Sequence, residues 1–182
     1  MLRIIFLSFF ISSIALANEK SHSINFEYSY SDINNGSGEE TSDLNDLVTS
    51  HLAYSYQYSV TEYFSIGLGY LKGDSSKADG IIIDIFTDSK IDYSSIMLSA
   101  LANYPISKRN YLYLKVNALQ YDYDIVDDNE VVFNEDGNDF GYSLGWMYKF
   151  DNGIGLNAGY EVLNLGKHID IKGINVGISY HF

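Results

Sequence analysis

Side chains that could catalyse a reaction are few in this sequence. Four histidines are present, His22, His51, His168 and His181, and cysteine is absent. His168 follows Glu161 closely, and a histidine oriented by a carboxylate could activate a serine for hydrolysis. No serine lies beside either residue in the sequence, and an inward-facing histidine more often only satisfies hydrogen bonds. We therefore expect no catalytic residues.

Carboxylates are the other side chains that could bind a ligand or take part in a reaction, and they gather in two stretches. Residues 32–46 hold five acidic residues and residues 122–139 hold eight, without a lysine or arginine in either stretch. The simplest interpretation is two solvated loops. Weak binding of Ca²⁺ or Mg²⁺ is the alternative, because both ions prefer oxygen ligands, although residues 134–139 lack the spacing of a calcium loop. We expect no structural metal and no other cofactor.

The composition limits the elements that can position these groups. The chain has 182 residues with a formal net charge of −13, which argues against a nucleic-acid partner. The absence of cysteine excludes disulfides and thiolate metal sites. With 17 tyrosines, 10 phenylalanines and a single proline, the chain is predicted to fold as one all-β domain.

The first seventeen residues have the pattern of a secretory signal peptide. Arg3 supplies a positive charge, residues 4–16 are apolar but too short to span a bilayer comfortably, and Ala15 and Ala17 form an A-x-A site. We expect cleavage after Ala17, which leaves residues 18–182 as the folded domain. An N-terminal anchor helix is the less favoured interpretation because the run ends in small residues.

The remaining chain alternates apolar with small or polar residues, which is the period of a strand with two different faces. The alternation occupies eight segments: residues 24–30, 48–58, 64–70, 95–104, 112–118, 140–149, 154–162 and 173–182. Short connections (59–61, 105–110, 151–152) alternate with longer ones (32–46, 72–92, 122–139, and the shorter 164–170). This pattern predicts an eight-stranded antiparallel up-and-down β-barrel. The apolar runs 81–83 and 131–133 do not alternate and are predicted to be hairpin tips beyond the barrel.

Three observations place the apolar face of this barrel on the outside, against lipid. The polar face carries only four charged residues, fewer than a solvated surface would. It is rich in glycine, serine and asparagine, which suit a crowded lumen. Aromatic residues also gather at both ends of the strands, as they do at membrane interfaces. The turn-end group is Phe26, Tyr58, Phe64, Tyr104, Tyr148, Phe150, Tyr180 and Phe182, and the loop-end group is Tyr30, Tyr70, Phe140 and Tyr142.

The mature chain resembles the family of eight-stranded bacterial outer-membrane barrels of the OmpA/OmpX type, which are small and porin-like. The resemblance rests on the signal peptide, the eight alternating strands and the last eight residues, in which Tyr180 and Phe182 end an alternating apolar series. It implies insertion into the outer membrane of a Gram-negative envelope by the barrel assembly machinery, which would read Tyr180 and Phe182. It also implies contact with outer-membrane lipid and lipopolysaccharide, and a monomer.

The four charged residues of the polar face are Glu27, Lys115, Lys149 and Glu161, and we predict that they form a balanced polar network in the lumen. An eight-stranded barrel filled in this way would be closed. The favoured function is therefore non-enzymatic, in envelope structure or adhesion, with the acidic loops contacting an external surface ligand. The alternatives are a porin-like conduit for small solutes and, less favoured, a lipid A-modifying enzyme.

Overall fold

The computed structural model describes residues 21–35, 48–75, 90–127, 130–166 and 169–182. Within these ranges no helix has the length and apolar character that a bilayer-spanning helix requires. The predicted signal peptide (residues 1–17), the apolar run 81–83 and His168 lie outside the described residues.

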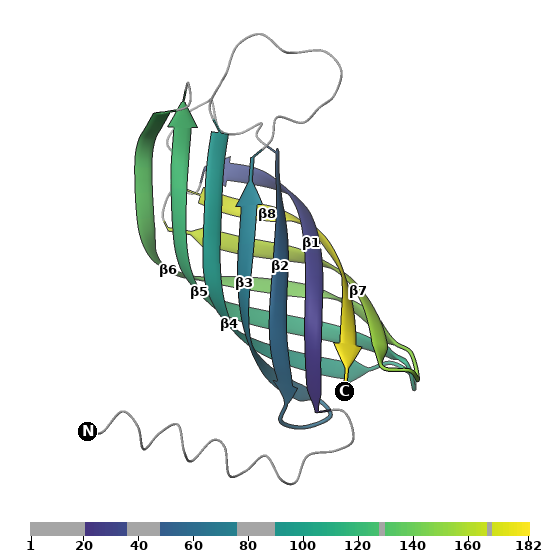
Figure 1. Ribbon diagram of the computed structural model, residues 1–182. Coiled ribbons are helices and arrows are strands. Elements are labelled where there is room, and N and C mark those ends of the chain that lie inside the picture. The colour runs from purple at the N-terminus through teal and green to yellow at the C-terminus, as the bar shows by residue number, and fades with distance from the viewer. Residues whose placement is uncertain (1–20, 36–47, 76–89, 128–129, 167–168) are drawn as a thin grey trace, which may run out of the picture.

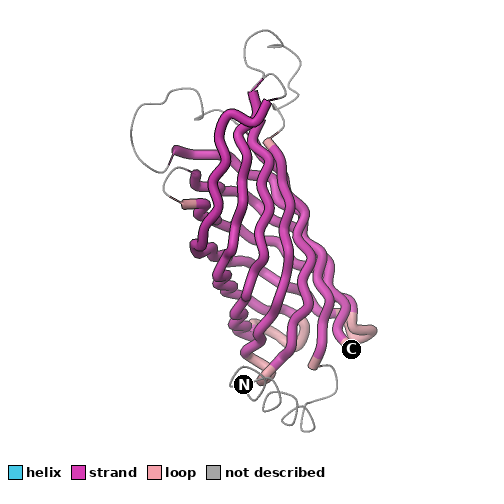
Figure 2. The backbone as a smooth tube through the Cα atoms, turned by 60° about the vertical axis from the view of Figure 1, so that its left-hand side comes forward, coloured by secondary structure: helices cyan, strands magenta, loops and turns pink. Residues whose placement is uncertain are grey.

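The described chain forms a closed barrel of eight antiparallel strands in sequence order, and β1 pairs with β8 to close it (Figure 1). This is the predicted topology. The strands are β1 (His22–Asn35), β2 (Val48–Ser59), β3 (Phe64–Asp74), β4 (Lys90–Pro105), β5 (Asn110–Asp127), β6 (Glu130–Lys149), β7 (Ile154–Leu165) and β8 (Ile169–His181). The described backbone is a tilted cylinder, and the C-terminus lies at the end with the short turns (Figure 2). We call this the turn end and the opposite one the loop end.

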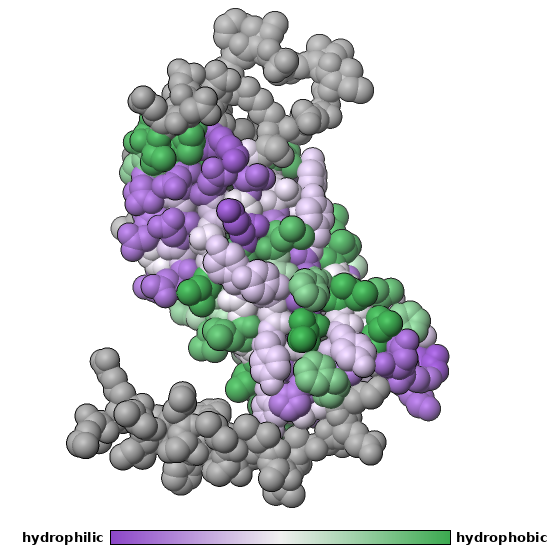
Figure 3. Space-filling model, viewed as in Figure 1, coloured by the Kyte–Doolittle hydropathy of each residue, from purple (hydrophilic) through white to green (hydrophobic). Residues whose placement is uncertain are grey.

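The alternation of the sequence separates an apolar outer surface from the interior. Leu98 points outward and is 62% exposed, whereas its neighbour Ser99 points inward and is 4% exposed. Isoleucine, leucine, valine and aromatic residues of all eight strands are exposed on the outer face in the same way. Figure 3 shows these apolar side chains over the lower part of the barrel, with a more hydrophilic zone above them toward the loop end. We call the lower zone the apolar band.

The segment 122–139, predicted as a loop, is instead strand over all its described residues. β5 and β6 have 18 and 20 residues and stay paired as far as Asp127 and Glu130, with a register shift between Ile125 and Val126. The apolar run 131–133 lies at the beginning of β6, near the tip of this hairpin as predicted. The prediction of a loop was wrong because the outward-facing residues here are acidic. The alternation of a strand continues, but without the apolar residues by which a strand is recognised in the sequence. We call residues 122–127 and 130–138 the β5–β6 extension.

Candidate functional site

The interior near the turn end is polar. Lys115 of β5 forms an ion pair with Glu27 of β1 across the lumen, and both side chains are nearly buried. Asn157 of β7 donates to the same carboxylate, with 3.1 Å from Nδ2 to Glu27 Oε1. Around them the interior is lined by small polar side chains, including Ser23, Asn25, Gln57, Ser99, Asn103, Asn117, Asn175 and Ser179. The Glu27 carboxylate is thus held by partners from two other strands.

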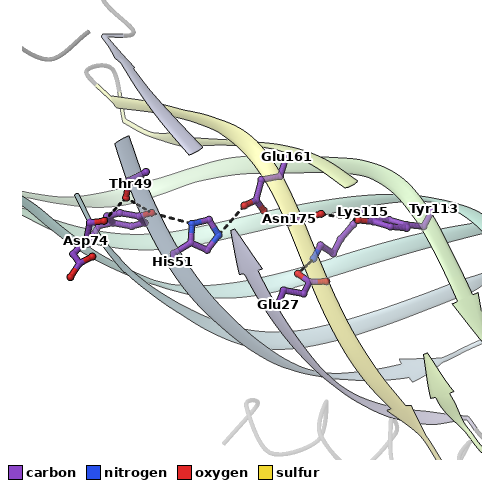
Figure 4. Close-up of polar contacts among 9 residues, drawn as sticks. Glu27, Thr49, His51, Asp74, Tyr113, Lys115, Glu161 and Asn175 are labelled. Atoms are coloured by element: carbon purple, nitrogen blue, oxygen red, sulfur yellow. Dashed lines mark hydrogen bonds and ion pairs between the residues drawn. The ribbon is translucent and has the colours of Figure 1, made fainter. Parts of the chain in front are cut away.

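A second buried pair lies closer to the loop end. His51 Nε2 of β2 is 2.9 Å from Glu161 Oε1 of β7. The other ring nitrogen, Nδ1, is 3.0 Å from the hydroxyl of Tyr93, which is also 3.0 Å from Thr49 Oγ1. Thr49 in turn donates to the backbone carbonyl of Asp74. Figure 4 shows this chain of contacts beside the Lys115–Glu27 pair. Both nitrogens of His51 are therefore engaged in structural contacts.

The structure brings the four predicted lumen residues together only in part. Glu27 and Lys115 form one pair, but the partner of Glu161 is His51 and not a lysine. Lys149 belongs to neither pair, because its Nζ lies over the Tyr111 ring, 4.7 Å from the ring centre. The sequence prediction missed His51 as the partner of Glu161. The one indication in the sequence was that the alternation of β2 directs His51 into the lumen. The pairing itself depends on which strands face each other across the lumen, which the sequence does not contain.

The interior near the loop end is apolar, which differs from the expectation of a polar lumen throughout. Its buried side chains come from all strands except β6, and we call them the inner apolar cluster. They are Ile33, Ala53, Leu71, Ile91, Tyr93, Met97, Leu119, Tyr121, Tyr123, Leu163, Leu165, Ile169 and Ile171. The loop-end part of the lumen is therefore more apolar than the turn-end part, although the buried polar residues Thr49, His51 and Ser95 lie among these side chains.

Tyr113 shows how tightly the turn-end part of the lumen is filled. Its ring is buried, and its hydroxyl donates to Asn175 Oδ1 at 3.2 Å. A Cβ atom placed on Gly145 would lie 2.7 Å from the Tyr113 ring, and one on Gly159 would lie 2.3 Å from its hydroxyl oxygen. These two glycines pair with each other on β6 and β7. The absence of their side chains is what makes room for the tyrosine.

The last residue takes part in closing the barrel. Phe182 N donates to the carbonyl oxygen of His22 at 2.8 Å, and His22 N donates to that of Phe182 at 3.1 Å. The Phe182 ring stacks on the imidazole of His22, with 5.8 Å between ring centres, and on the ring of Tyr180. The predicted assembly residues thus lie on the seam between β1 and β8.

The β5–β6 extension lies beyond the apolar band and is acidic on its outer face. Asp122 pairs with Asp136, and Asp124 accepts a hydrogen bond from Asn134 at 2.8 Å. On the inner face Tyr123 donates to Glu135 at 2.8 Å, and burial together with this contact raises the pKa of Tyr123. In the described part of the chain no group of three or more His, Asp or Glu side chains is arranged to hold a metal ion.

Three apolar side chains protrude at the tip of the extension. Val131, Val132 and Phe133 are 59%, 60% and 45% exposed. The acidic outer faces of β5 and β6 separate them from the apolar band, as the hydrophilic zone in Figure 3 illustrates. Contact with lipid at the apolar band therefore does not explain why these three apolar side chains are exposed.

Comparison with solved structures places the fold among membrane barrels. The structure of Neisserial surface protein A (NspA) matches with a TM-score of 0.72 and 14% identity, covering 91% of this chain and 100% of that one. Ail, the attachment invasion locus protein of Yersinia pestis, matches with a TM-score of 0.59 and 16% identity over the same shares. A de novo designed transmembrane β-barrel matches with a TM-score of 0.53 and 13% identity, covering 92% of this chain and 100% of that one. At these identities the likeness concerns the fold alone.

The sequence itself carries the family assignment. No curated protein sequence matches the chain. The family model described as outer membrane protein beta-barrel domain matches residues 4–182, which is nearly the whole chain. The protein therefore belongs to this family of outer-membrane β-barrels, and its location is the bacterial outer membrane.

Proposed function

We propose that the protein is a non-enzymatic surface-interaction barrel that contacts external surfaces through its β5–β6 extension. Barrels of this kind have short periplasmic turns and longer extracellular loops, so the loop end faces the outside of the cell. The observation that carries the proposal is the exposure of Val131, Val132 and Phe133 beyond the apolar band. Exposed apolar groups rimmed by polar residues are typical of protein interaction sites.

The filling of the lumen supports an interaction role over the alternative of a solute conduit. An eight-stranded barrel is just wide enough to hold its own side chains. Here the turn-end part contains the Lys115–Glu27 pair and the ring of Tyr113, and the loop-end part contains the His51–Glu161 contact and the inner apolar cluster. A hydrated solute would have to displace these buried side chains along the whole length of the lumen.

The arrangement of histidines also favours a role without catalysis. Both nitrogens of His51 are engaged, and the ring is buried with Glu161. His181 Nε2 lies 3.1 Å from Ser179 Oγ at the turn end. That end faces the periplasm, away from the outer rim at which lipid A-modifying enzymes of similar architecture work. We infer that these histidines serve packing and hydrogen bonding.

The charge of the loop end suggests which surfaces the protein would contact. Ail, which shares the fold, has been crystallised with the heparin analogue sucrose octasulfate, a polyanion. The outer face of the extension here carries Asp122, Asp124 and Asp136, which would repel sulfates. We therefore propose contact with neutral or basic protein surfaces. In the membrane we expect a monomer, inserted by the barrel assembly machinery and surrounded by lipid and lipopolysaccharide, with divalent cations binding only weakly at the acidic residues of the loop end.

A substitution at the tip tests this function. Cells that display a variant with Val131, Val132 and Phe133 all replaced by serine should attach poorly to epithelial cells and to immobilised serum proteins. The matched control replaces Val60, Tyr63 and Ile106, exposed apolar residues of the periplasmic turns, by serine. Attachment of the tip variant at the level of the wild-type and control cells, with equal amounts of barrel in the outer membrane, would contradict the proposal.

A further inference from the structure

β6 is longer than the strand that borders it on one side. Its pairing with β7 begins at Gly141 and Leu163, whereas its pairing with β5 continues to Glu130. Residues 130–140 of β6 therefore have a paired strand only on the β5 side among the described residues. In Figure 1 the ends of β5 and β6 reach well beyond those of β7 and β8. Within the part of the chain that the structure describes, the extension thus presents one free strand edge.

The direction of the backbone groups on this edge follows from Asp139. Its carboxylate accepts from the backbone N–H of Phe140 at 2.8 Å and from that of Gly166, after β7, at 3.0 Å. The Phe140 N–H therefore points toward β7 and away from β5. Because alternate residues of a strand direct their N–H and C=O groups to the same side, Asn138 and Asp136 turn theirs toward the free edge. Asp139 closes the β6–β7 ladder, and beyond it no described residue pairs with this edge.

A free edge of this kind is a template for another strand. The charge of the edge argues against a second copy of the chain, because Glu135 and Asp136 of one β6 would lie beside the same acids of the other. The outer face of β5 adds Asp122 and Asp124 next to them. The same charges would attract lysine or arginine side chains on a strand of opposite charge.

We propose that the free edge of β6, from Asn134 to Asn138, binds an extended basic peptide segment of a partner protein as an added strand. The backbone groups of Asn138 and Asp136 would supply main-chain hydrogen bonds, and the Asp136 carboxylate would lie beside basic side chains on the outer face. Val132 and Phe133 would cover apolar residues at one end of the segment. This inference rests on the proposed surface-interaction function and names its contact and the chemistry of its partner.

The test uses a substitution that changes the edge without changing its charge. Asn138→Pro removes an N–H that points away from β5, so the β5–β6 ladder is kept while the edge is blocked. Asn138→Ala is the matched control because it keeps the N–H. The mature barrel in phosphatidylcholine nanodiscs is titrated with a fluorescent peptide of about eight alternating lysine and valine residues, which is the length of an ordinary strand. Empty nanodiscs provide the baseline for peptide binding to lipid.

We expect Asn138→Pro to weaken peptide binding about ten-fold or more while Asn138→Ala binds like the wild type. Asp136→Asn should weaken binding by a smaller factor and reduce its dependence on salt. Equal binding by the proline variant and the wild type would overturn the proposal, since the contact would then be general charge attraction. It would also be overturned by equally tight binding of a glutamate–valine peptide, or by dimers of the wild type that Asn138→Pro abolishes.

Failure of this test is separate from failure of the proposed function. If Asn138→Pro leaves peptide binding intact but the serine variant of residues 131–133 loses cell attachment, the surface function stands and only the strand-addition mode is wrong. If neither variant changes its readout, both are wrong. The folded state of each variant is checked by the migration of the unheated barrel in an electrophoresis gel.

Discussion

His51 of β2 and Glu161 of β7 contact each other across the lumen, with 2.9 Å between Nε2 and Oε1 and only 2% and 5% of their side chains exposed. β2 and β7 are not neighbours in the barrel, because β1 and β8 lie between them, so this contact links two separate parts of the wall. A buried pair that loses one member leaves a polar group without its partner in a region of low dielectric constant. The contribution of this contact to the free energy of unfolding can therefore be measured.

Replacing Glu161 by alanine should lower the free energy of unfolding by about 3–5 kcal/mol, the usual cost of removing one partner of a buried pair. Glu161→Gln should cost less, because the amide oxygen can still accept from His51. Urea titrations of the barrel in lipid vesicles measure both. An alanine variant as stable as the wild type would show that the pair makes no net contribution.

A comparable result is expected for the pair nearer the turn end. Lys115→Ala should destabilise the barrel because the Glu27 carboxylate, held by Lys115 and Asn157, loses its counter-charge. The double variant Lys115→Met, Glu27→Gln should recover part of this loss, since both charges are then gone. Thermal unfolding of the three proteins gives the comparison. A double variant that is less stable than Lys115→Ala would contradict this explanation.

Removing Phe182 should impair insertion without preventing synthesis or export. The truncated chain loses the two backbone hydrogen bonds between Phe182 and His22, and an unpaired edge in lipid is costly. Cell fractionation should find the protein in the periplasm or degraded, whereas Phe182→Tyr, which keeps both bonds and an aromatic ring, should reach the membrane. Normal outer-membrane levels of the truncated chain would count against the role of this residue.

Leu98 and Ser99 provide a matched pair on the two faces of β4. Leu98→Arg puts a charge into the apolar band and should destabilise the barrel by about 2–4 kcal/mol when refolded into vesicles. Leu114→Arg on β5 should behave alike, since Leu114 also points outward. Ser99→Arg should act differently, by crowding Asn117, to which Ser99 donates at 2.7 Å. A neutral Leu98→Arg would mean that this position does not contact lipid.

The wild-type protein should show no steady conductance in a planar bilayer, because the turn-end part of the lumen and the inner apolar cluster are both filled. Smaller side chains in the cluster, as in the double variant Leu119→Ala, Leu163→Ala, should raise the frequency of brief openings without producing a stable pore. Long-lived channels from the wild-type monomer would contradict the closed lumen and favour the conduit. Detergent and lipid without protein serve as the control for leak currents.

The topology could be predicted from the sequence because it depends on local patterns, namely a period of two and the alternation of short and long connections. The ends of the strands could not, since Asp122 and Asp124 continue the strand period in residue types that are common in loops. The lumen contacts were harder still. That Lys115 meets Glu27, and that Glu161 meets His51 instead of a lysine, depends on barrel tilt and stagger. These are properties of the closed cylinder and not of any single strand.

The place of Tyr113 between Gly145 and Gly159 has a consequence for how this protein can change over evolutionary time. Outward positions need only stay apolar, so one aliphatic residue can replace another independently of its neighbours. A Cβ atom at Gly159 would overlap the Tyr113 hydroxyl, and one at Gly145 would also lie 2.3 Å from the backbone oxygen of Ala158, so a smaller ring alone does not make room for a side chain at Gly145. Among related sequences the two glycines should therefore stay fixed even where the ring changes, while the membrane-facing surface changes one residue at a time.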